Sequence, residues 1–147
     1  MSNIAAARAI IERVRRLGVV DFCICGGSRN APLIVALETG YTFVDERSAA
    51  FFALGRAKRD GKPVAVITTS GTAAAELLPA AVEAFYSGLP LILITADRPA
   101  RFRGTAAPQS IEQVGLFGVY AATDIATWNR RTPLHINVEF DEPLIDE

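Results

Sequence analysis

Four short stretches of the chain combine small residues with charged or hydroxyl side chains that could bind a polar ligand. They are residues 26–30 (GGSRN), 45–47 (DER), 69–72 (TSGT) and 96–98 (ADR). Arginine binds a planar carboxylate or a phosphate through two hydrogen bonds, and glycine lets the backbone approach a ligand closely. A carboxyl group can exchange a proton with a ligand nitrogen. These residue types therefore indicate a site for an anion or a polar ring.

Each of the first two stretches also has a structural interpretation. The first could be an ordinary turn between a strand and a helix, with Ser28 as the helix N-cap. In the second, the acidic pair could be a helix cap or a surface charge. Alternatively it holds a partly buried carboxyl, whose raised pKa would suit proton exchange with a ligand.

The other two stretches leave similar alternatives open. Residues 69–72 could present backbone N–H groups to an anion or a polar ring, or could simply be a tight turn. They match neither the Walker A motif nor the dinucleotide fingerprint. Arg98 could be a second anion clamp, or could pair with Asp97. Arg101 and Arg103 follow in the next loop, where a charge cluster is more often a solvated face.

Other kinds of chemistry are missing from the sequence. The single histidine, His135, lies within an apolar segment, which favours a structural role. No Ser-His-Asp set and no cluster with metal-ligand spacing can be assembled, so we expect no metal site in this chain. Cys23 and Cys25 fall on one face of an apolar strand and are predicted to be buried thiols in a reducing, cytoplasmic environment.

Alternating apolar and helix-periodic segments would position these residues. The expected strands are 19–25, 41–44, 64–68, 89–95 and 134–138, and the expected helices are 4–17, 32–37, 48–59, 72–86 and 111–117. Continuously apolar strands between helices are typical of a parallel sheet that is covered on both faces. The pattern thus predicts an α/β fold, a three-layer α/β/α domain with a central, mainly parallel sheet. In such sheets ligands bind beyond the carboxyl ends of the strands, where the four stretches lie.

Length and composition limit the classes of protein. The 147 residues fit a single domain, and a net charge of −1 with 50% hydrophobic residues excludes disorder and bulk-charge binding of nucleic acid. No apolar run is long enough for a membrane span, and charged residues interrupt any signal peptide. The high apolar content indicates that a partner covers some of the surface.

In this order, a set of motifs resembles the N-terminal, pyrimidine-binding (PYR) domain of thiamine-diphosphate enzymes. The motifs are GSRNAPL (27–33), DERSAAFFALG (45–55), PVAVITTSGT (63–72), LITADRP (93–99), APQSIEQVGLFG (107–118), HINV (135–138) and EPL (142–144). TTSGT is common to the whole family. Together, GSRNAPL, DER, TADRP and PQSIEQVGLFG are much more specific, and resemble the synthases of menaquinone biosynthesis that join 2-oxoglutarate to isochorismate.

The resemblance implies a role for particular residues. Glu46 would be the catalytic acid that hydrogen-bonds the aminopyrimidine ring of the cofactor, thiamine diphosphate. Thr69, Ser70 and Gly71 would also contact that ring. The substrate-binding residues, on the isochorismate side, would be Ser28, Arg29, Arg98 and Gln109.

The resemblance also implies what lies outside this chain. Residues 1–147 would be one PYR domain, without the middle domain and without the C-terminal domain that binds the diphosphate through Mg²⁺ or Mn²⁺. The chain would then be inactive alone and would work in a cytoplasmic homodimer or larger assembly. Residues 119–132 are shorter than the family's usual helical segment. Two alternatives are a subunit of a split thiamine-diphosphate enzyme and a non-catalytic interaction module.

Overall fold

Five parallel strands form the centre of the structure. The computed structural model describes residues 1–145. The strands are β1 (Phe22–Cys25), β2 (Tyr41–Phe43), β3 (Val64–Thr68), β4 (Leu91–Asp97) and β5 (Leu134–Glu139). Their order in the sheet is β2-β1-β3-β4-β5, and every neighbouring pair is parallel. The three inner strands are buried along their whole length, which explains why they read as unbroken apolar runs.

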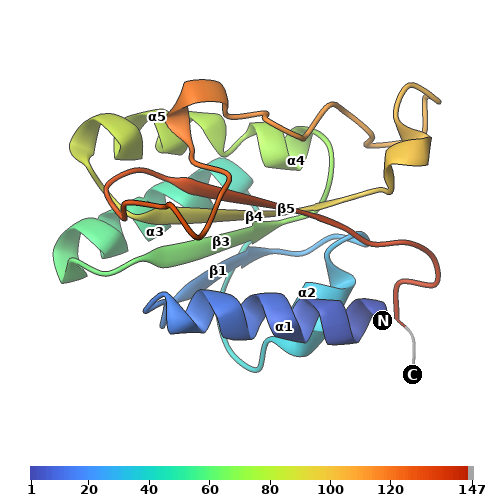
Figure 1. Ribbon diagram of the computed structural model, residues 1–147, viewed down its shortest axis with the longest axis horizontal. Coiled ribbons are helices and arrows are strands. Elements are labelled where there is room, and N and C mark those ends of the chain that lie inside the picture. The colour runs from blue at the N-terminus through green and yellow to red at the C-terminus, as the bar shows by residue number, and fades with distance from the viewer. Residues whose placement is uncertain (146–147) are drawn as a thin grey trace.

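Helices cover both faces of this sheet (Figure 1). The helices are α1 (Asn3–Arg16), α2 (Ala31–Ala36), α3 (Glu46–Asp60), α4 (Thr72–Ala75) and α5 (Leu78–Ser87), and two 3₁₀ turns span Ala100–Phe102 and Gly118–Tyr120. In Figure 1, α1 and α2 lie below the sheet, whereas α4 and α5 lie above it. The buried residues of α3 share one core with those of α5, so α3 lies on the same face as α5. The predicted three-layer α/β/α architecture is therefore confirmed.

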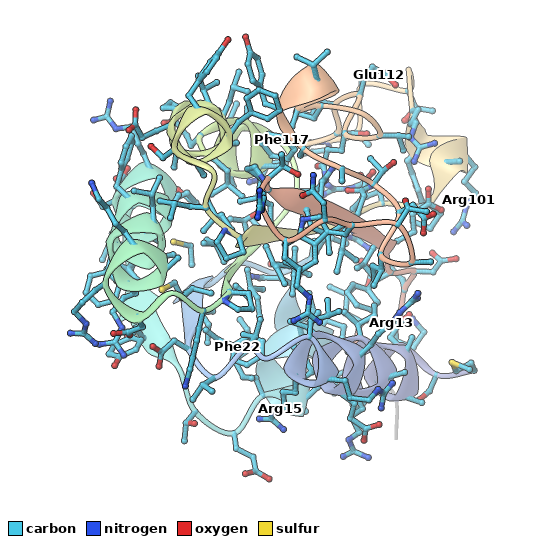
Figure 2. All side chains as sticks on the ribbon, turned by 60° about the vertical axis from the view of Figure 1, so that its left-hand side comes forward. Arg13, Arg15, Phe22, Arg101, Glu112 and Phe117 are labelled. Carbon is cyan, nitrogen blue, oxygen red and sulfur yellow. The ribbon has the colours of Figure 1, made fainter. Side chains whose placement is uncertain are left out.

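The two faces of the sheet form two separate cores. Alternate residues of a strand point to opposite faces, so Phe22 and Ile24 pack with α1, whereas Cys23 and Cys25 pack with α3 and α5. Figure 2 shows Phe22 toward α1 and Phe117 on the α5 side. The buried side chains of α3 are all alanine, which lets this helix lie close to the sheet.

The prediction of one continuous helix over residues 72–86 is wrong. The chain forms the short α4, then a tight turn at Glu76 and Leu77, and then α5. Pro79 lies in the first turn of α5, where its missing N–H is tolerated. Inside one continuous helix the same proline would have removed a hydrogen bond, and for this reason the segment restarts.

The helix expected over residues 111–117 is also wrong. This segment forms successive turns and leads into the 3₁₀ turn at Gly118–Tyr120. Gly115 adopts a positive φ angle of 73°, which a right-handed helix excludes. The buried Gln113 side chain bonds to strand ends instead of lying on a helix face.

Within residues 1–145, no helix has both the length and the apolar character that crossing a membrane requires. The longest helix, α3, has 15 residues and carries charged side chains at both ends.

The two cysteines are expected to be almost inert toward thiol reagents in the folded protein. Both are buried and unbridged, as the sequence predicted, and burial raises the pKa of each thiol to about 12. At pH 8 this lowers the thiolate fraction, and hence the labelling rate, by about three orders of magnitude. Labelling with Ellman's reagent should be slow in native buffer and fast in guanidinium chloride. Fast native labelling of either thiol would contradict this burial.

Candidate functional site

Parallel pairing brings the four polar stretches to one edge of the sheet. They follow β2, β1, β3 and β4, which are neighbours in that order. The carboxyl ends of these strands all lie on the right-hand side of Figure 1, near the start of α2 and the loop after β4. The four polar stretches therefore lie at one edge of the sheet, as the sequence predicted from topology alone.

Asn30 shapes the turn after β1. Its Oδ1 accepts a hydrogen bond from Gly27 N at 2.9 Å, and its Nδ2 donates to the Cys25 carbonyl at 2.8 Å. Asn30 is completely buried and occupies the N-cap position of α2, so the alternative of Ser28 as the cap is wrong. Ser28 is exposed instead, at the rim of the site. An asparagine directly before Ala-Pro was the available sequence signal for this turn.

Arg29 is buried and fixed by the C-terminal segment. Its Nη1 donates to the Phe140 carbonyl at 2.9 Å, and its Nη2 lies 3.0 Å from a carboxylate oxygen of Glu142. The Nε atom is buried without a hydrogen-bond partner among the described residues. The guanidinium thus already holds one carboxylate and keeps an unused donor.

The turns after β1 and β3 touch at Gly27. A Cβ atom on Gly27 would lie 2.6 Å from Cβ and 2.7 Å from Cγ2 of Thr69. Only a hydrogen fits there, so glycine is required for the approach of the two turns. This contact fixes the spacing between Arg29 and the Thr69–Gly71 turn.

Glu46 and Asp45 have different positions at the start of α3. Asp45 is the exposed N-cap, and its Oδ2 accepts from Ser48 N at 2.7 Å. Hydrogen bonds from Ser48 hold the pKa of Asp45 below its usual value. Glu46 is half-buried in the first helical turn, and its charge adds to the burial that raises the pKa of Cys25 at the end of β1. The capping interpretation therefore applies to Asp45, and Glu46 is the partly buried carboxyl.

Arg98 joins the turn after β3 to the loop after β4. Its Nη1 donates to Ser70 Oγ at 2.8 Å and to the Gln109 carbonyl at 3.1 Å. Burial, followed by repulsion from Arg29, lowers the pKa of Arg98. Two guanidinium groups that repel each other at one edge form a site that an anion would stabilise.

The backbone N–H of Gly71 is not available to a ligand. It donates to Gln113 Oε1 at 2.7 Å, so the expectation of a free N–H at this residue is wrong. Gly71 has a φ of 82°, and a Cβ atom there would lie 3.0 Å from Gln109. The turn is therefore held from inside the protein, with Thr69 and Ser70 also buried.

The other arginines of the loop after β4 have structural partners. Arg101 pairs with Asp141, and Arg103 pairs with Glu139 and lies 3.5 Å from Asp97. These two arginines hold the loop after β4 against the C-terminal end of β5 and the segment that follows it. Only Arg98 of this cluster faces the turn after β3.

The eight predicted residues thus fall into two groups. Arg29, Thr69, Ser70, Gly71, Arg98 and Gln109 form one connected group through the contacts above. Ser28 and Glu46 lie at the same edge, but within residues 1–145 their side chains make no hydrogen bond or ion pair. A cavity of about 460 Å³ lies elsewhere, along β5 and Arg13, and includes none of the eight. In the described part of the chain, no group of three acidic, histidine or cysteine residues could hold a metal ion.

His135 has the structural environment that the sequence favoured. The ring is buried, packs edge-on against Phe117, and its Nε2 lies 2.8 Å from Thr95 Oγ1. Burial lowers the pKa of His135 to about 4, although the charge of Asp97 opposes this shift.

His135 is expected to make stability depend on pH. Its folded pKa of about 4 lies below the unfolded value of 6.5, so between them only the unfolded chain binds the proton. The stabilisation is complete above pH 6.5 and is lost as pH falls through 4, for a total of about 3 kcal/mol. Urea unfolding between pH 7 and 4 measures this, and His135→Gln should remove the part due to this ring. An identical pH profile in that variant would contradict the assignment.

Comparison with known proteins agrees with this geometry. Residues 4–116 match the family described as thiamine pyrophosphate enzyme, N-terminal TPP binding domain. The chain is 49% identical to the 2-succinyl-5-enolpyruvyl-6-hydroxy-3-cyclohexene-1-carboxylate synthase of Bdellovibrio bacteriovorus, over 99% of this chain and 31% of that protein. It is 53% identical to the same-named protein of Akkermansia muciniphila, over 86% of this chain and 27% of the relative.

The chain spans about 30% of the length of the curated relatives it matches. The alignment with the Bdellovibrio protein extends over 162 positions, more than the 147 residues here, so that relative has additional residues within the matched stretch. This agrees with the expectation that a segment of this chain is shortened. The match covers most of the sheet and all four polar turns, and the chain belongs to the family of thiamine pyrophosphate enzymes, as their N-terminal TPP binding domain.

Proposed function

We propose that this chain is the pyrimidine-binding part of a thiamine-diphosphate-dependent synthase that decarboxylates 2-oxoglutarate and adds the succinyl unit to isochorismate. The observation that carries this is the pair Arg29 and Arg98, which lies beside the Thr69–Gly71 turn at the edge that also holds Glu46. The printed names of the relatives support the choice of synthase.

The residues at this edge fit the proposed cofactor. Thr68 Oγ1, at the end of β3, is buried without a partner among the described residues, and Gly27 and Gly71 let the turns at this edge pack closely against Thr69 and Gln109. When bound, thiamine diphosphate supplies the carbon that attacks the 2-oxo acid and stabilises the charge left after loss of carbon dioxide. Thr69 and Ser70 would line the ring, and Gly71 would contribute shape rather than its N–H.

Glu46 would hold a proton at the ring nitrogen of the aminopyrimidine. Its half-buried position beside the end of β1 limits water access, and it has no hydrogen bond in the described structure that would compete with a ligand. A carboxyl in such a place can pass a proton to and from a ligand nitrogen.

The substrate carboxylates would bind at the arginine side of the edge. Both proposed substrates are dicarboxylates, and arginine matches the planar carboxylate geometry. Arg98 would bind one carboxylate, and Arg29 would contribute its unused Nε. Ser28 and Gln109 would close the rim, since both are exposed beside these arginines.

The diphosphate and its Mg²⁺ or Mn²⁺ would bind to another domain, and the site would be completed by a partner in a cytoplasmic homodimer or larger assembly. Phe51 and Phe52, both exposed on α3, the helix that begins at Glu46, support a surface that a partner covers.

The test uses the full-length protein that carries this chain, supplied with thiamine diphosphate, Mg²⁺, 2-oxoglutarate and isochorismate. Release of carbon dioxide and formation of the coupled product should both require the cofactor. The 147-residue chain assayed alone should show no turnover, because its described residues include no metal site. Cofactor-independent turnover, or none in the full-length protein, would overturn the proposal.

A further inference from the structure

A line of buried and partly buried hydrogen bonds connects Asp97, at the end of β4, with the backbone of Gly71. Asn137 Nδ2 donates to Asp97 Oδ2 at 2.9 Å, and Gln113 Nε2 donates to Asn137 Oδ1 at 3.0 Å and to the Ala96 carbonyl at 3.2 Å. Gln113 Oε1 then accepts from Gly71 N at 2.7 Å. The line joins β4, β5, the loop after β4 and the turn after β3.

The two ends of this line fix its direction. The Asp97 carboxylate can only accept, so the Asn137 amide must turn its NH₂ group toward it and its oxygen toward Gln113. Gly71 N–H can only donate, so the Gln113 amide must present its oxygen there and its NH₂ group to Asn137. Both ends require the same orientation of the two amides.

A side branch is compatible with this direction. Thr95 Oγ1 donates to Asn137 Oδ1 at 2.7 Å and lies 2.8 Å from His135 Nε2. Because a hydroxyl has one hydrogen, this orientation of Asn137 makes His135 Nε2 the donor to Thr95 Oγ1. Every group of the branch then has a partner.

Asp97 also positions Arg98, the second part of the candidate site. Its Oδ1 accepts from Arg98 N at 2.8 Å, and the Arg98 side chain donates to Ser70. Gly71 and Arg98 are thus positioned from the same carboxylate, which is 1% exposed. Such buried networks are rigid when every member is satisfied.

We propose that Asn137 and Gln113 are positioning residues. Because the Asp97 carboxylate can only accept, it orients the two amides so that Gln113 presents an oxygen to Gly71 N–H. This hydrogen bond holds the Thr69–Gly71 turn in its position relative to Arg98. Asn137 and Gln113 touch no ligand themselves. The consequence for cofactor binding rests on the proposed function, whereas the effect on Gly71 does not.

A reciprocal exchange tests this direction. In Asp97→Asn, the new amide that accepts from Arg98 N turns its NH₂ group toward the NH₂ group of Asn137. In Asn137→Asp, the new carboxylate faces the carboxylate of Asp97. Neither pair can form a hydrogen bond. In the double variant, the new amide at position 97 can accept from Arg98 N and donate to the new carboxylate at position 137. That carboxylate in turn accepts from Thr95 and Gln113, so the direction is restored. Asn129→Asp is the matched control, because this exposed asparagine uses only its Oδ1 as an acceptor.

Two measurements on the full-length protein give the outcome. Without cofactor, amide hydrogen exchange at Gly71 should be about 10-fold faster in each single variant and normal in the double variant. The KM for thiamine diphosphate should rise about 10-fold in the single variants, with kcat at saturating cofactor changed less, and should recover in the double variant.

If Asp97→Asn or Asn137→Asp does not fold, Gln113→Met tests the same proposal. Methionine has a similar volume to glutamine but cannot form the hydrogen bonds to Asn137 and Gly71. It should show the same faster exchange at Gly71. Unchanged exchange in Gln113→Met, or no recovery in a folded double variant, would overturn the proposal. If the wild-type protein does not bind thiamine diphosphate, the proposed function fails, and the exchange at Gly71 still decides whether the line positions the turn.

Discussion

Replacing Glu46 by glutamine is expected to lower kcat of the full-length protein by about 10²–10⁴-fold, the usual contribution of a positioned acid or base. An amide of the same shape can hydrogen-bond a ring nitrogen but cannot exchange a proton with it. The substitution should change the free energy of unfolding little, since Glu46 makes no hydrogen bond or ion pair within residues 1–145. Steady-state kinetics at saturating cofactor, together with urea unfolding, measure both effects.

The neighbouring acid provides the matched control for Glu46. Asp45→Asn also removes one negative charge from the first turn of α3, but asparagine is an equally good N-cap and can still accept from Ser48 N. Its kcat should stay within a few-fold of the wild-type value. If Glu46→Gln retained kcat to the same degree as Asp45→Asn, Glu46 would not be the catalytic acid.

Gly27→Ala is expected to lower the free energy of unfolding by about 1–3 kcal/mol, the usual cost of overpacking. The new Cβ would lie 2.6 Å from Thr69 Cβ, closer than side-chain carbons approach each other in folded proteins. The φ angle of Gly27 is not in the positive range, so the cost would come from the clash and not from backbone strain. Moving Thr69 should also raise the KM for thiamine diphosphate.

The adjacent glycine separates this clash from a general effect of substitution in the turn. In Gly26→Ala the new Cβ would have Ile34 Cδ1 as its nearest neighbour, at 3.9 Å, which is an ordinary contact. Urea unfolding should therefore show Gly26→Ala close to wild type and Gly27→Ala clearly destabilised. Equal midpoints for the two variants would show that the turns after β1 and β3 do not need this close approach.

Local patterns in the sequence were enough for the strands and for the edge at which the polar stretches lie. The strands expected at 19–25, 64–68 and 89–95 correspond to β1, β3 and β4, which are buried along their whole length, so their continuous apolar character predicted the parallel sheet directly. Since parallel strands end at a common edge, the residues after them could be placed together without knowing any contact. The two wrong helices failed where Pro79 restarts a helix and where Gly115 adopts a positive φ.

Contacts between residues far apart in the chain could not be predicted in this way. Asn30 looked like part of a turn, and Gln113 like part of a helix, yet the first holds Gly27 and the second reaches Gly71, 42 residues away. Arg29 reads as a ligand-binding arginine, but its Nη1 is already bound to Phe140, 111 residues later. Hydrogen bonds between residues far apart in the chain produce no periodic pattern of residue types in the sequence.

By itself, the sequence determined the layered parallel sheet, the edge at which the polar stretches meet and the residue types that this edge carries, because burial and strand direction are encoded in local apolar patterns. Only the tertiary structure decided how those residues are used: Asp45 caps a helix while Glu46 has no hydrogen bond in the described chain, and Gly71 turns its N–H inward to Gln113. The physical reason is that a hydrogen bond depends on the distance and direction between two groups, and those are fixed only when the strands have paired and the loops have packed.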